Sequence, residues 1–600
     1  MTDSSYRTSY RTHMAGALRA TNIGERVRLV GWIHRRRDLG GRVFIDLRDL
    51  KGLAQVSCGS DSLSDEAMEQ VRRLGSEAVI AVEGEVVGRP PEAQNPDMPT
   101  GEVEVRAVEV TELAPSETPP ILVAYGPEEE LASEELRLRY RFLDLRRPAL
   151  QQNLRVRHCI NRAIRASLDA LGFIEIETPI LTRPTPEGAR DYLTPSRVTK
   201  GEFYSLPQSP QLYKQILMVA GFDRYYQIAR CLRDEDLRAD RQPEFTQLDL
   251  EMSFVDETDI FAVGESVMAE VWAECAERTV PRPFTQLKYS DVLERYGTDK
   301  PDLRIPWELV DVSDVLTDSE FRIFRGAIEA GGRVRGFRVP TGASLSRKAL
   351  DELDRVAQEA GAPGALWTKL SESGVQGGFG KQLSADEVGG LKARLAALDG
   401  DLLVLIAAED QRANPALDAL RRHLGSVMGA VDDGDRFLWV TDFPLFDAHP
   451  DSGKPVPSHH PFTSPAPEYL ELLETDPLAV KSRAYDLVYN GSEFGSGSIR
   501  INQPDVQRRV FAALGIGAEE ADRKFGFLLE AFKYGAPPHG GFALGLDRVA
   551  MHLAGGSSLR DVIAFPKTTA ARALMEGAPA PIAPEELREL GIEVIGRADG

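Results

Sequence analysis

Alternating apolar and polar residues over the first fifth of the chain predict a set of short β-strands. In such a pattern every second side chain points to the same face, as a strand with one buried face requires. The predicted strands are residues 27–34, 42–49, 52–57, 78–87 and 102–110. Residues 63–75 have a helical pattern and fall between the third strand and the fourth. We therefore expect five strands with one helix after the third.

The pattern changes several times further along the chain. A Pro-rich, acidic stretch follows the predicted strands and is typical of a hinge. Long helical patterns then alternate with strands, until a long segment rich in Gly, Ala and Leu with no concentrated polar cluster indicates an inserted domain. The expected parts are a disordered N-terminus (1–14), a barrel domain (15–115), a hinge (116–149), a main domain in two parts (150–302 and 423–566), the inserted domain (303–422) and a C-terminal extension (567–600).

Composition narrows the class of protein. The 71 Lys and Arg against 93 Asp and Glu give a net charge of −22, which argues against a protein that coats DNA but leaves room for one basic groove. No apolar stretch approaches the ~18 residues of a membrane span, and the N-terminus lacks the apolar core of an export signal. The four cysteines form no CxxC pair, so we expect a reducing cytoplasm and no zinc site.

Cationic residues surround an aromatic residue on the second predicted strand. Five strands with a helix after the third is the order of the OB fold, a small β-barrel. Arg35, Arg36, Arg37, Arg42 and Arg48 flank Phe44, and Gln55 lies on the next strand. OB grooves bind single-stranded nucleic acid by stacking bases on aromatic rings, worth roughly 1–3 kcal/mol per base, while cations follow the phosphates. The alternative is that Phe44 belongs to the core and the arginines form a solvated rim; we favour binding.

The second half of the chain lacks the usual phosphate-binding loops. It has no GxxxxGK[ST] sequence and no GxGxxG after a strand. Instead, residues 230–251 gather arginines and carboxylates and then alternate as a strand, and residues 535–548 form a Gly-rich strand and turn that lead into a helix. Glycines there would let a flat ligand lie against the backbone. For the charged stretch the alternative is a solvated surface.

Three of these stretches resemble the motifs of class II aminoacyl-tRNA synthetases. Arg233-Asp234-Glu235 with Phe245 is similar to motif 2, "GLDR" at 545–548 to motif 3, and "GFIEIETPIL" at 172–181 to motif 1, the dimer-forming segment. An N-terminal OB domain marks the aspartyl, asparaginyl and lysyl subgroup. The stretches "TPEGARDY", "PQSPQLYKQ", "HHPFT" and "GSGSIR" resemble the bacterial-type aspartyl family. The resemblance runs in order through essentially the whole chain from residue 14.

The resemblance implies an α+β fold. Its parts would be an N-terminal OB-fold barrel, an antiparallel-sheet catalytic domain interrupted by an inserted α/β domain, and a C-terminal extension. The implied reaction joins L-aspartate and ATP as aspartyl-adenylate and then transfers aspartate to tRNA-Asp, in a homodimer formed through motif 1. The α-carboxylate of the substrate is ionised at neutral pH and is itself the nucleophile, so the site would work by alignment and charge stabilisation.

The resemblance also implies the residues that hold ATP. Arg233 and Arg548 would be catalytic: Arg233 would hold the α-phosphate and the attacking carboxylate, and Arg548 would cover adenine and touch the γ-phosphate. Phe245 would stack under adenine. The remaining expected ATP contacts are Asp234, Glu235, Gln242, Glu493, Gly545, Leu546 and Asp547. Asp486 and Glu493 resemble the ligands of Mg²⁺, which prefers hard oxygen donors; the alternative is a solvated acidic loop.

Lys214 and Arg500 would face the side-chain carboxylate of aspartate. Two cations there would reject asparagine, because a neutral amide would leave buried charge unpaired, and a lysine pocket would need carboxylates instead. The other residues implied for this pocket are Glu187, Ser209, Gln211, Arg233, Asp249, His459 and His460.

The implied tRNA contacts lie in two places. Arg238 and Arg241 would meet the acceptor end, and the OB groove would read the anticodon with Arg37, Leu39, Phe44, Gln55, Arg89 and Glu104. Leu39 offers no hydrogen-bond donor, which favours an enzyme restricted to tRNA-Asp over one that also charges tRNA-Asn. Two rival functions are a nucleic-acid-binding relative without catalysis and a tRNA-independent ligase that makes asparagine. The intact Arg233, Phe245 and Arg548 argue against the first, and the OB domain argues against the second.

Overall fold

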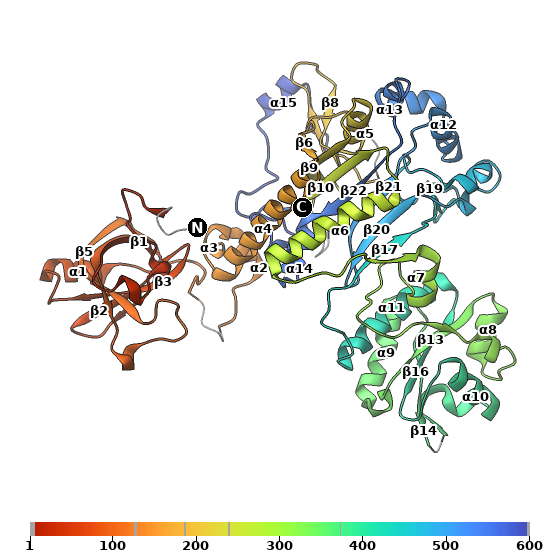
Figure 1. The fold of residues 1–600 in the computed structure, drawn as a ribbon, viewed down its shortest axis with the longest axis horizontal. Coiled ribbons are helices and arrows are strands. Elements are labelled where there is room, and N and C mark those ends of the chain that lie inside the picture. Colours follow the sequence, from red (N-terminus) through yellow and green to blue (C-terminus); the bar gives the residue numbers. More distant parts are fainter. Residues whose placement is uncertain (1–5, 125–128, 185–187, 238–240, 373, 597–600) are drawn as a thin grey trace. The chain divides into compact units, whose positions relative to one another are not determined.

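The chain forms two compact units in a computed structural model that describes residues 6–124, 129–184, 188–237, 241–372 and 374–596. The first unit comprises Met1–Arg155, Leu237–Gln242 and Ala554–Ile582, and the second comprises Val156–Asp236, Pro243–Leu553 and Ala583–Gly600 (Figure 1). No helix among the described residues is long and apolar enough to cross a membrane.

A closed five-stranded barrel forms the N-terminal part of the first unit, with strand order β1-β2-β3-β5-β4. Its elements are β1 (Arg26–Asp38), β2 (Arg42–Asp49), β3 (Gly52–Gly59), α1 (Asp65–Arg73), β4 (Val79–Gly88) and β5 (Val103–Ala114). Alternate residues such as Val43, Ile45 and Leu47 fill its core. The side chain of Ser64 caps α1 by accepting a hydrogen bond from the amide of Ala67, which satisfies a free donor of the first turn. The predicted strands, helix and OB order are confirmed.

The prediction of a disordered N-terminus is wrong for residues 6–14; residues 1–5 lie outside the described part. The amide of Thr12 donates to the carbonyl of Arg28 on β1 at 2.9 Å, and Met14 is completely buried. Ala15 then joins the barrel core. Gly16 follows so close to the backbone of Lys51 that a Cβ would lie 2.2 Å from its carbonyl carbon, so only glycine fits. Apolar burial therefore orders a segment whose polar composition suggested disorder.

Two short helices lie within the predicted hinge at 116–149, namely α2 (Glu134–Arg139) and α3 (Arg141–Asp144). Arg141 is buried, pairs with Asp144 at 2.8 Å and donates to the backbone carbonyls of Arg560, Ile563 and Ala564. One guanidinium thus fastens α3 to the segment that follows the main domain, and the hinge is in part ordered structure.

An eight-stranded sheet is the centre of the second unit, in the order β11-β17-β20-β21-β22-β10-β9-β6. Its strands are β6 (Ile174–Glu175), β9 (Arg224–Leu232), β10 (Glu244–Ser253), β11 (Thr285–Lys288), β17 (Phe437–Thr441), β20 (Ala484–Tyr489), β21 (Ser492–Ile499) and β22 (His539–Gly545). The six central strands pair antiparallel, while β11 and β6 join the two edges in parallel. The expected antiparallel catalytic sheet is confirmed, and parallel edge strands are an addition.

Helices and two short hairpins complete this domain. The helices are α4 (Pro148–Ala170), α5 (Gln211–Val219), α6 (Glu257–Ala276), α7 (Tyr289–Tyr296), α12 (Pro504–Ala513), α13 (Ala518–Phe532), α14 (Leu546–Leu553) and α15 (Pro584–Leu590). The hairpins pair β7 (Leu193–Pro195) with β8 (Phe203–Ser205) and β18 (Phe446–Ala448) with β19 (Pro455–Pro457). Helix α6 runs across the sheet (Figure 1), where Phe261 stacks on Trp439 of β17 with ring centroids 4.4 Å apart.

The inserted domain has a five-stranded sheet in the order β12-β13-β16-β14-β15. Its elements are β12 (Val310–Asp311), α8 (Arg322–Glu329), β13 (Arg333–Val339), α9 (Arg347–Glu359), β14 (Leu366–Ser371), β15 (Gly374–Gln376), α10 (Ala385–Arg394), β16 (Leu402–Ala408) and α11 (Asp410–Val427). Alternate residues of β16 belong to two separate apolar clusters, one with α9 and α11 and one with α8 and α10. Both faces of the sheet are covered, as expected of an α/β domain, although α11 continues past the predicted boundary at residue 422.

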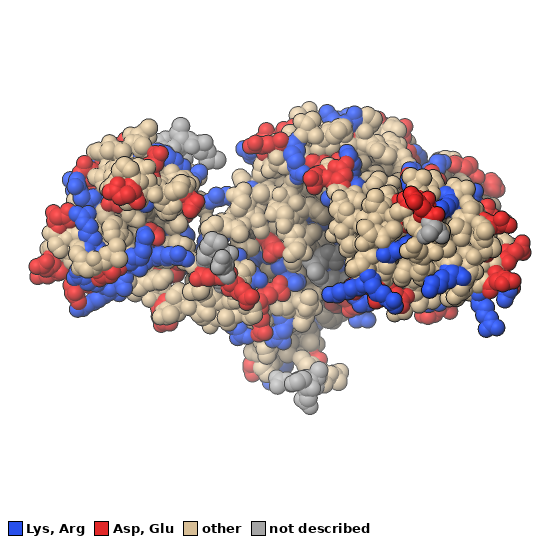
Figure 2. All heavy atoms as spheres, turned by 90° about the horizontal axis from the view of Figure 1, so that it is seen from below, with Lys and Arg blue, Asp and Glu red and all other residues tan. Residues whose placement is uncertain are grey.

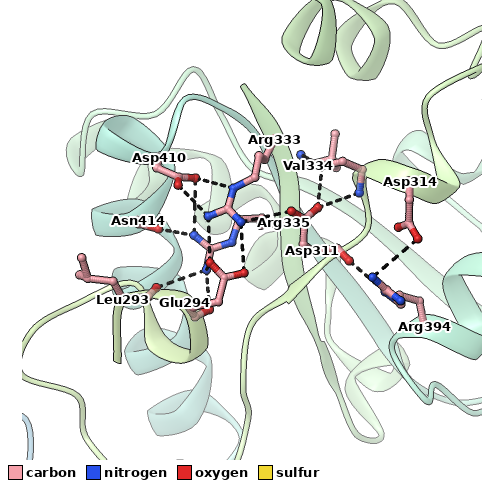
Figure 3. A network of polar contacts seen from close by, with 11 residues as sticks. Leu293, Glu294, Asp311, Asp314, Arg333, Val334, Arg335, Arg394, Asp410 and Asn414 are labelled. Atoms are coloured by element: carbon pink, nitrogen blue, oxygen red, sulfur yellow. Dashed lines mark hydrogen bonds and ion pairs between the residues drawn. The ribbon is translucent and has the colours of Figure 1, made fainter. Parts of the chain in front are cut away.

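Two arginines of β13 connect the inserted domain to α7 (Figure 3). Arg333 pairs with Glu294 of α7 at 2.9 Å, with Asp410 of α11 at 2.6 Å and with Asp311 of β12 at 3.2 Å. Arg335 is buried and donates to the carbonyls of Leu293 and Glu294 at the end of α7. These contacts hold the insertion against a helix of the main domain.

Candidate active site

Strand β10 contributes two buried carboxylates to the candidate site. Asp249 and Glu251 lie two residues apart and so point to the same face, and both are completely buried. Glu251 faces Gly541 of β22 in the antiparallel register. A Cβ at Gly541 would lie 1.7 Å from Oε2 of Glu251, so only glycine leaves room for that carboxylate.

Two buried cations complete a charge cluster with these carboxylates. Nζ of Lys214, from α5, lies 3.0 Å from Oδ1 of Asp249 and 3.6 Å from Oε2 of Glu251. Nε of Arg500, directly after β21, donates to Oε1 of Glu251 at 2.9 Å. The sequence argument placed two cations against one substrate carboxylate; the structure adds two protein carboxylates that balance them. Among fully buried groups, such balance is needed because an unpaired charge costs several kcal/mol.

The cluster sets the protonation of its members. Burial raises the pKa of Asp249 in spite of the opposing field of Lys214. Burial also acts to raise the pKa of Glu251, but Arg500 and Lys214 outweigh it and lower that pKa. His460 lies with Nε2 at 2.7 Å from Arg500, and burial together with Arg500 holds the pKa of this imidazole well below its usual range. His460 is therefore uncharged near neutral pH, as a neighbour of two cations should be.

Polar atoms of this cluster remain without a protein partner among the described residues. They are Nε2 of Gln211 and Oδ2 of Asp249, both buried. Ser209 accepts from the amide of Gln211 at 3.2 Å and so helps to fix the start of α5. Buried donors and acceptors are nearly always satisfied, by protein, water or ligand. An unmatched donor and an unmatched carboxylate oxygen are groups that a small zwitterionic ligand could satisfy.

Arg233 and Phe245 lie together at the end of the hairpin formed by β9 and β10. The guanidinium of Arg233 is 5.0 Å from the centre of the Phe245 ring, and its Nε is buried with no partner in the described structure. The amide of Arg233 donates to the carbonyl of Pro243 at 2.9 Å and keeps the two sides of the hairpin together. The structure therefore brings the predicted phosphate ligand and the predicted adenine platform into contact.

The predicted motif 3 residues make several contacts within the protein. Arg548 of α14 donates to the backbone carbonyl of Glu493. Asp547 is buried, accepts from the amide of Thr246 at 2.8 Å and pairs with Arg157 of α4. Leu546 is buried as well, whereas Gly545 pairs with Gln247 of β10. Asp547 and Leu546 therefore also support the fold, and their predicted ATP contact stays a prediction.

Asp486 and Glu493 are brought close together by the adjacent strands β20 and β21. Burial and the negative charge of Asp486 raise the pKa of Glu493. Nε2 of His459 lies 3.4 Å from Oδ1 of Asp486; burial lowers the pKa of His459, but Asp486 outweighs it and the net shift is upward. His459 is thus turned toward this acidic pair. Two carboxylates with excess negative charge fit a divalent cation that takes its other ligands from phosphate and water. No group of three or more candidate metal ligands occurs among the described residues.

Several predicted residues lie elsewhere or outside the described part. Glu187 and Arg238 belong to the stretches that the structure does not describe. Gln242 is in the first unit, buried, and both ends of its amide bond the backbone of Lys567, so its predicted ATP contact gains no support. Asp234 is exposed and its backbone bridges Arg190. Glu235 is partly buried and Arg241 is exposed.

Four residues that sequence reasoning did not assign belong to the charge cluster or line it. They are Glu251, Ser498, Gln215 and His539. Oγ of Ser498 accepts from Arg500 at 2.7 Å, and Nε2 of His539 lies 3.3 Å from Oε1 of Gln215. Alternation along β10 was a sufficient signal for Glu251, since Asp249 was already placed on that face. Gln215 is on α5, Ser498 on β21 and His539 on β22, and none of them gave a local signal.

The barrel carries a second polar site, an open pocket of about 410 Å³. Its lining residues are His34, Arg35, Arg37, Asp46, Leu53, Gln55, Arg89, Ala93, Asn95 and Met98. Arg37 donates to Asp46 at 2.9 Å and to Gln55 at 3.1 Å, and Gln55 donates to Glu104 at 2.7 Å. Arg89 is buried, and the Nη2 atom of its guanidinium has no protein partner in the described structure. The volume of this pocket falls in the range of small-ligand pockets, and the polar groups that line it suit a nucleobase.

Phe44 is on the outward face of β2, half-buried, between the core residues Val43 and Ile45. The alternative that made Phe44 a core residue is therefore wrong. Leu39 is 72% exposed in the turn between β1 and β2. Arg48 departs from the prediction because it is buried and pairs with Glu77, and so cannot join the exposed cations around Phe44.

Two known protein-family models match this chain. Residues 133–569 match the model of class II tRNA synthetases (D, K and N), and residues 27–113 match the OB-fold nucleic acid binding domain. The chain belongs to the class II tRNA synthetases of the D, K and N group. The family assignment agrees with the sheet, the arginines of motifs 2 and 3 and the barrel described above.

Relatives that align over nearly the full length of this chain are about 50% identical to it. The aspartate–tRNA(Asp/Asn) ligase of Caldanaerobacter subterraneus is 50% identical over 585 residues, which cover 97% of this chain and 98% of the relative. The aspartate–tRNA ligase of Geobacillus kaustophilus is 50% identical over 587 residues, covering 98% and 99%. Among solved structures, asparaginyl-tRNA synthetase from Pyrococcus horikoshii with asparaginyl-adenylate has a TM-score of 0.57 at 20% identity, covering 94% of this chain and 97% of that chain. The last comparison supports the fold.

Proposed function

We propose that this protein is an aspartate–tRNA ligase that activates L-aspartate with ATP and transfers it to tRNA-Asp. The observation that carries the proposal is the buried cluster of Lys214, Arg500, Asp249 and Glu251. It offers cations to a substrate carboxylate and leaves one carboxylate oxygen of Asp249 for a substrate ammonium. The names of relatives that are about half identical to this chain point to the same reaction.

Donors remain in the cluster for an incoming carboxylate. A lysine ammonium has three N–H groups and an arginine guanidinium has five. Lys214 contacts Asp249 and Glu251, and Arg500 contacts Glu251, Ser498 and His460, which leaves at least one donor on each cation. Asparagine would place an NH₂ group against such donors, and that mismatch leaves buried polar groups unpaired. Sites that hydrogen-bond a substrate group can reject the mismatched analogue by orders of magnitude.

The chemical step then needs alignment and positive charge. The α-carboxylate of aspartate attacks the α-phosphorus of ATP and pyrophosphate leaves. Arg233, stacked against Phe245 with a free buried Nε, is the cation best placed for the reacting phosphate. Stacking holds the planar guanidinium before the substrate arrives, so little reorganisation is needed in the transition state. Arg548, held near Glu493, would neutralise the phosphates on the other side.

Asp486 and Glu493 would hold Mg²⁺ together with the phosphates of ATP. Bound there, the ion would neutralise phosphate charge and fix the phosphate geometry. Support comes from the pKa of Glu493, which burial and, after it, the negative charge of Asp486 raise; a cation would relieve that repulsion.

Exchange of labelled pyrophosphate into ATP tests the proposal. We expect exchange that depends on aspartate and fails with asparagine or lysine, followed by transfer of aspartate to tRNA-Asp. Activation without any transfer would favour the tRNA-independent ligase. Specific tRNA binding without exchange would favour the non-catalytic relative.

A second candidate is an enzyme that charges tRNA-Asn as well. The names of several relatives include both tRNAs, which supports it. We place first the strict form, which charges tRNA-Asp only. The reason is that Leu39 is exposed on the hairpin beside the groove and has no donor for a non-cognate base. An unmatched polar edge costs about 1–3 kcal/mol, or roughly tenfold to hundredfold in specificity. Charging the two purified tRNAs side by side distinguishes them: comparable efficiency on tRNA-Asn would exclude the strict form.

We also infer that two copies associate through motif 1. Strand β6 is an edge strand, and apolar side chains in and after it are exposed: 52% for Ile174, 53% for Ile180 and 52% for Leu181. Such a group of apolar side chains is typical of an interface. Light scattering should give a mass of two chains for the wild type. Ile180→Asp should lower the measured mass toward that of a single chain. The free cysteines are consistent with a reducing compartment such as the cytoplasm.

A further inference from the structure

Two of the four cysteines lie side by side in the second unit, away from the charge cluster. Cys159 is in α4 and Cys275 is near the end of α6, 116 residues later. Sγ of Cys159 lies 3.6 Å from the carbonyl oxygen of Glu274, the residue before Cys275. The thiol of Cys159 is also near enough to that of Cys275 to help raise its pKa, after burial. Two helices far apart in sequence thus bring two thiols close together.

The surroundings keep this pair accessible and fixed. Both cysteines are only partly buried, and the contact between Cys159 and Glu274 is at the surface. Arg162, one turn after Cys159, pairs with the carboxylate of Glu274 at 3.0 Å and joins the two helices.

The other two cysteines provide an internal contrast. Cys58 in the barrel core and Cys231 on β9 are completely buried. Burial raises the pKa of Cys58 to about 12, so this thiol stays protonated and unreactive. Neither is positioned to meet a second thiol in the described structure. Reactivity toward oxidants should therefore be confined to the pair in α4 and α6.

We propose that Cys159 and Cys275 form a reversible disulfide when the protein meets a hydroperoxide. Cys159 reacts first, because burial, and after it the neighbouring Cys159 thiol, raise the pKa of Cys275 and keep that thiol protonated. The sulfur of Cys159 gives two electrons to the peroxide, becomes a sulfenic acid and releases one water or alcohol. The sulfur of Cys275 then attacks the sulfenic sulfur, its proton joins the departing hydroxide, and a second water leaves. A dithiol or thiol reductant restores both thiols by exchange.

Small movements suffice for the bond. The two sulfur atoms must close to about 2.05 Å, and side-chain rotation with a slight shift of one helix can supply that. The bond would link α4, whose Arg157 holds Asp547, to the end of α6. The site does not depend on the proposed function, and its test is chemical.

Peptide mapping after oxidation tests the proposal. The reduced full-length protein is treated with hydrogen peroxide, its free thiols are alkylated, and the digest is analysed by mass spectrometry. We expect a peptide pair joined through Cys159 and Cys275 that dithiothreitol separates, with Cys58 and Cys231 still free. The number of thiols that react quickly in the native protein should fall from about two to none.

Variants and competing products make the result decisive. Cys159→Ser and Cys275→Ser should each remove the linked peptides, whereas Cys58→Ala should keep them. The wild-type mapping stands even if a serine variant fails to fold. An unchanged thiol count would overturn the proposal. So would sulfinic acid on Cys159 with Cys275 free, or a bond between Cys159 residues of two copies seen on a non-reducing gel.

Discussion

At the scale of single residues, the candidate site depends on charges that protein neighbours already balance. Lys214 and Arg500 are buried with two carboxylates, so each has a structural role besides any contact with substrate. Removing one member of such a cluster leaves its partners unpaired and costs about 3–5 kcal/mol of stability. Loss of activity in a Lys214 variant would therefore mix unfolding with lost binding. Arg233 is a cleaner probe because its contact with Phe245 is a stacking contact in the hairpin.

Arg233→Ala should abolish most adenylate formation. Losing one cation that acts on the reacting phosphate should lower the rate of pyrophosphate exchange roughly 10²–10³-fold, while tRNA affinity stays nearly unchanged. Arg224→Ala, at the start of β9 and directed to the ring of Phe173, should keep the exchange rate and serves as the control. Wild-type exchange in the Arg233 variant would refute the assignment.

His552 should make the protein sensitive to mild acid. Burial, then Arg548 and Arg304, lower the pKa of this imidazole from 6.5 to about 4. The unfolded chain therefore binds a proton near pH 6.5 that the folded chain does not bind until about pH 4. The stabilisation is complete above pH 6.5 and is lost as the pH falls through that window, by at most roughly 3 kcal/mol.

Urea unfolding between pH 7 and pH 4 measures this effect. His552→Gln should flatten the fall in unfolding free energy, whereas His449→Gln, at an exposed position of the hairpin that contains β18, should leave the slope as it is. Equal slopes in the wild type and the His552 variant would show that this histidine does not titrate as expected.

At the scale of elements, alternation along strands decides which side chains meet a ligand. On β2, Phe44 points outward while its neighbours fill the barrel core, and on β10 the same rule pairs Asp249 with Glu251. Helix ends matter as well. The carbonyls at the end of α7 are capped by Arg335 of the inserted sheet, which replaces the hydrogen bonds that a helix terminus lacks.

Arg335→Met should destabilise the insertion more than Arg333→Met. Arg335 is buried and satisfies two helix carbonyls and Asn414, so its loss should cost roughly 2–4 kcal/mol. Arg333 has more ion pairs (Figure 3) but is partly exposed, and exposed pairs are worth about 0–1 kcal/mol. The midpoint of unfolding, followed by the fluorescence of Trp307 and Trp367, measures both. Equal losses would contradict the role of burial.

At the scale of the whole molecule, two compact units divide the chemistry. The barrel pocket lies in one unit and the buried charge cluster in the other. Acidic and basic side chains are mixed over the face of the molecule in Figure 2, although the net charge is −22. Binding of an anionic tRNA must therefore rely on local cations such as Arg37 and Arg89 and not on the overall field.

Phe44→Ala should lower the efficiency of tRNA charging about tenfold while sparing aspartate-dependent pyrophosphate exchange. The reason is that a stacked base contributes roughly 1–3 kcal/mol in one unit while activation takes place in the other. Tyr10→Ala, an exposed aromatic of the same unit, is the control. Arg37→Ala should also flatten the salt dependence of tRNA binding by about one unit of slope. If exchange falls as much as charging, the variant has damaged the fold.

The sequence by itself determined the parts of this protein that local pattern encodes. Alternation gave the barrel strands, and the motifs gave the family and the residues predicted for the phosphates and the pocket, because each lies within a short stretch. Tertiary structure alone decided how those stretches meet. Glu251 neutralises Lys214 and Arg500, which come from α5 and the end of β21, and Asp547 supports β10 through the amide of Thr246. The order of residues 6–14, the burial of Arg48 and the contact of Cys159 with Glu274 likewise depend on packing between distant segments. No local pattern records which distant partners will balance a buried charge or cover an apolar side chain.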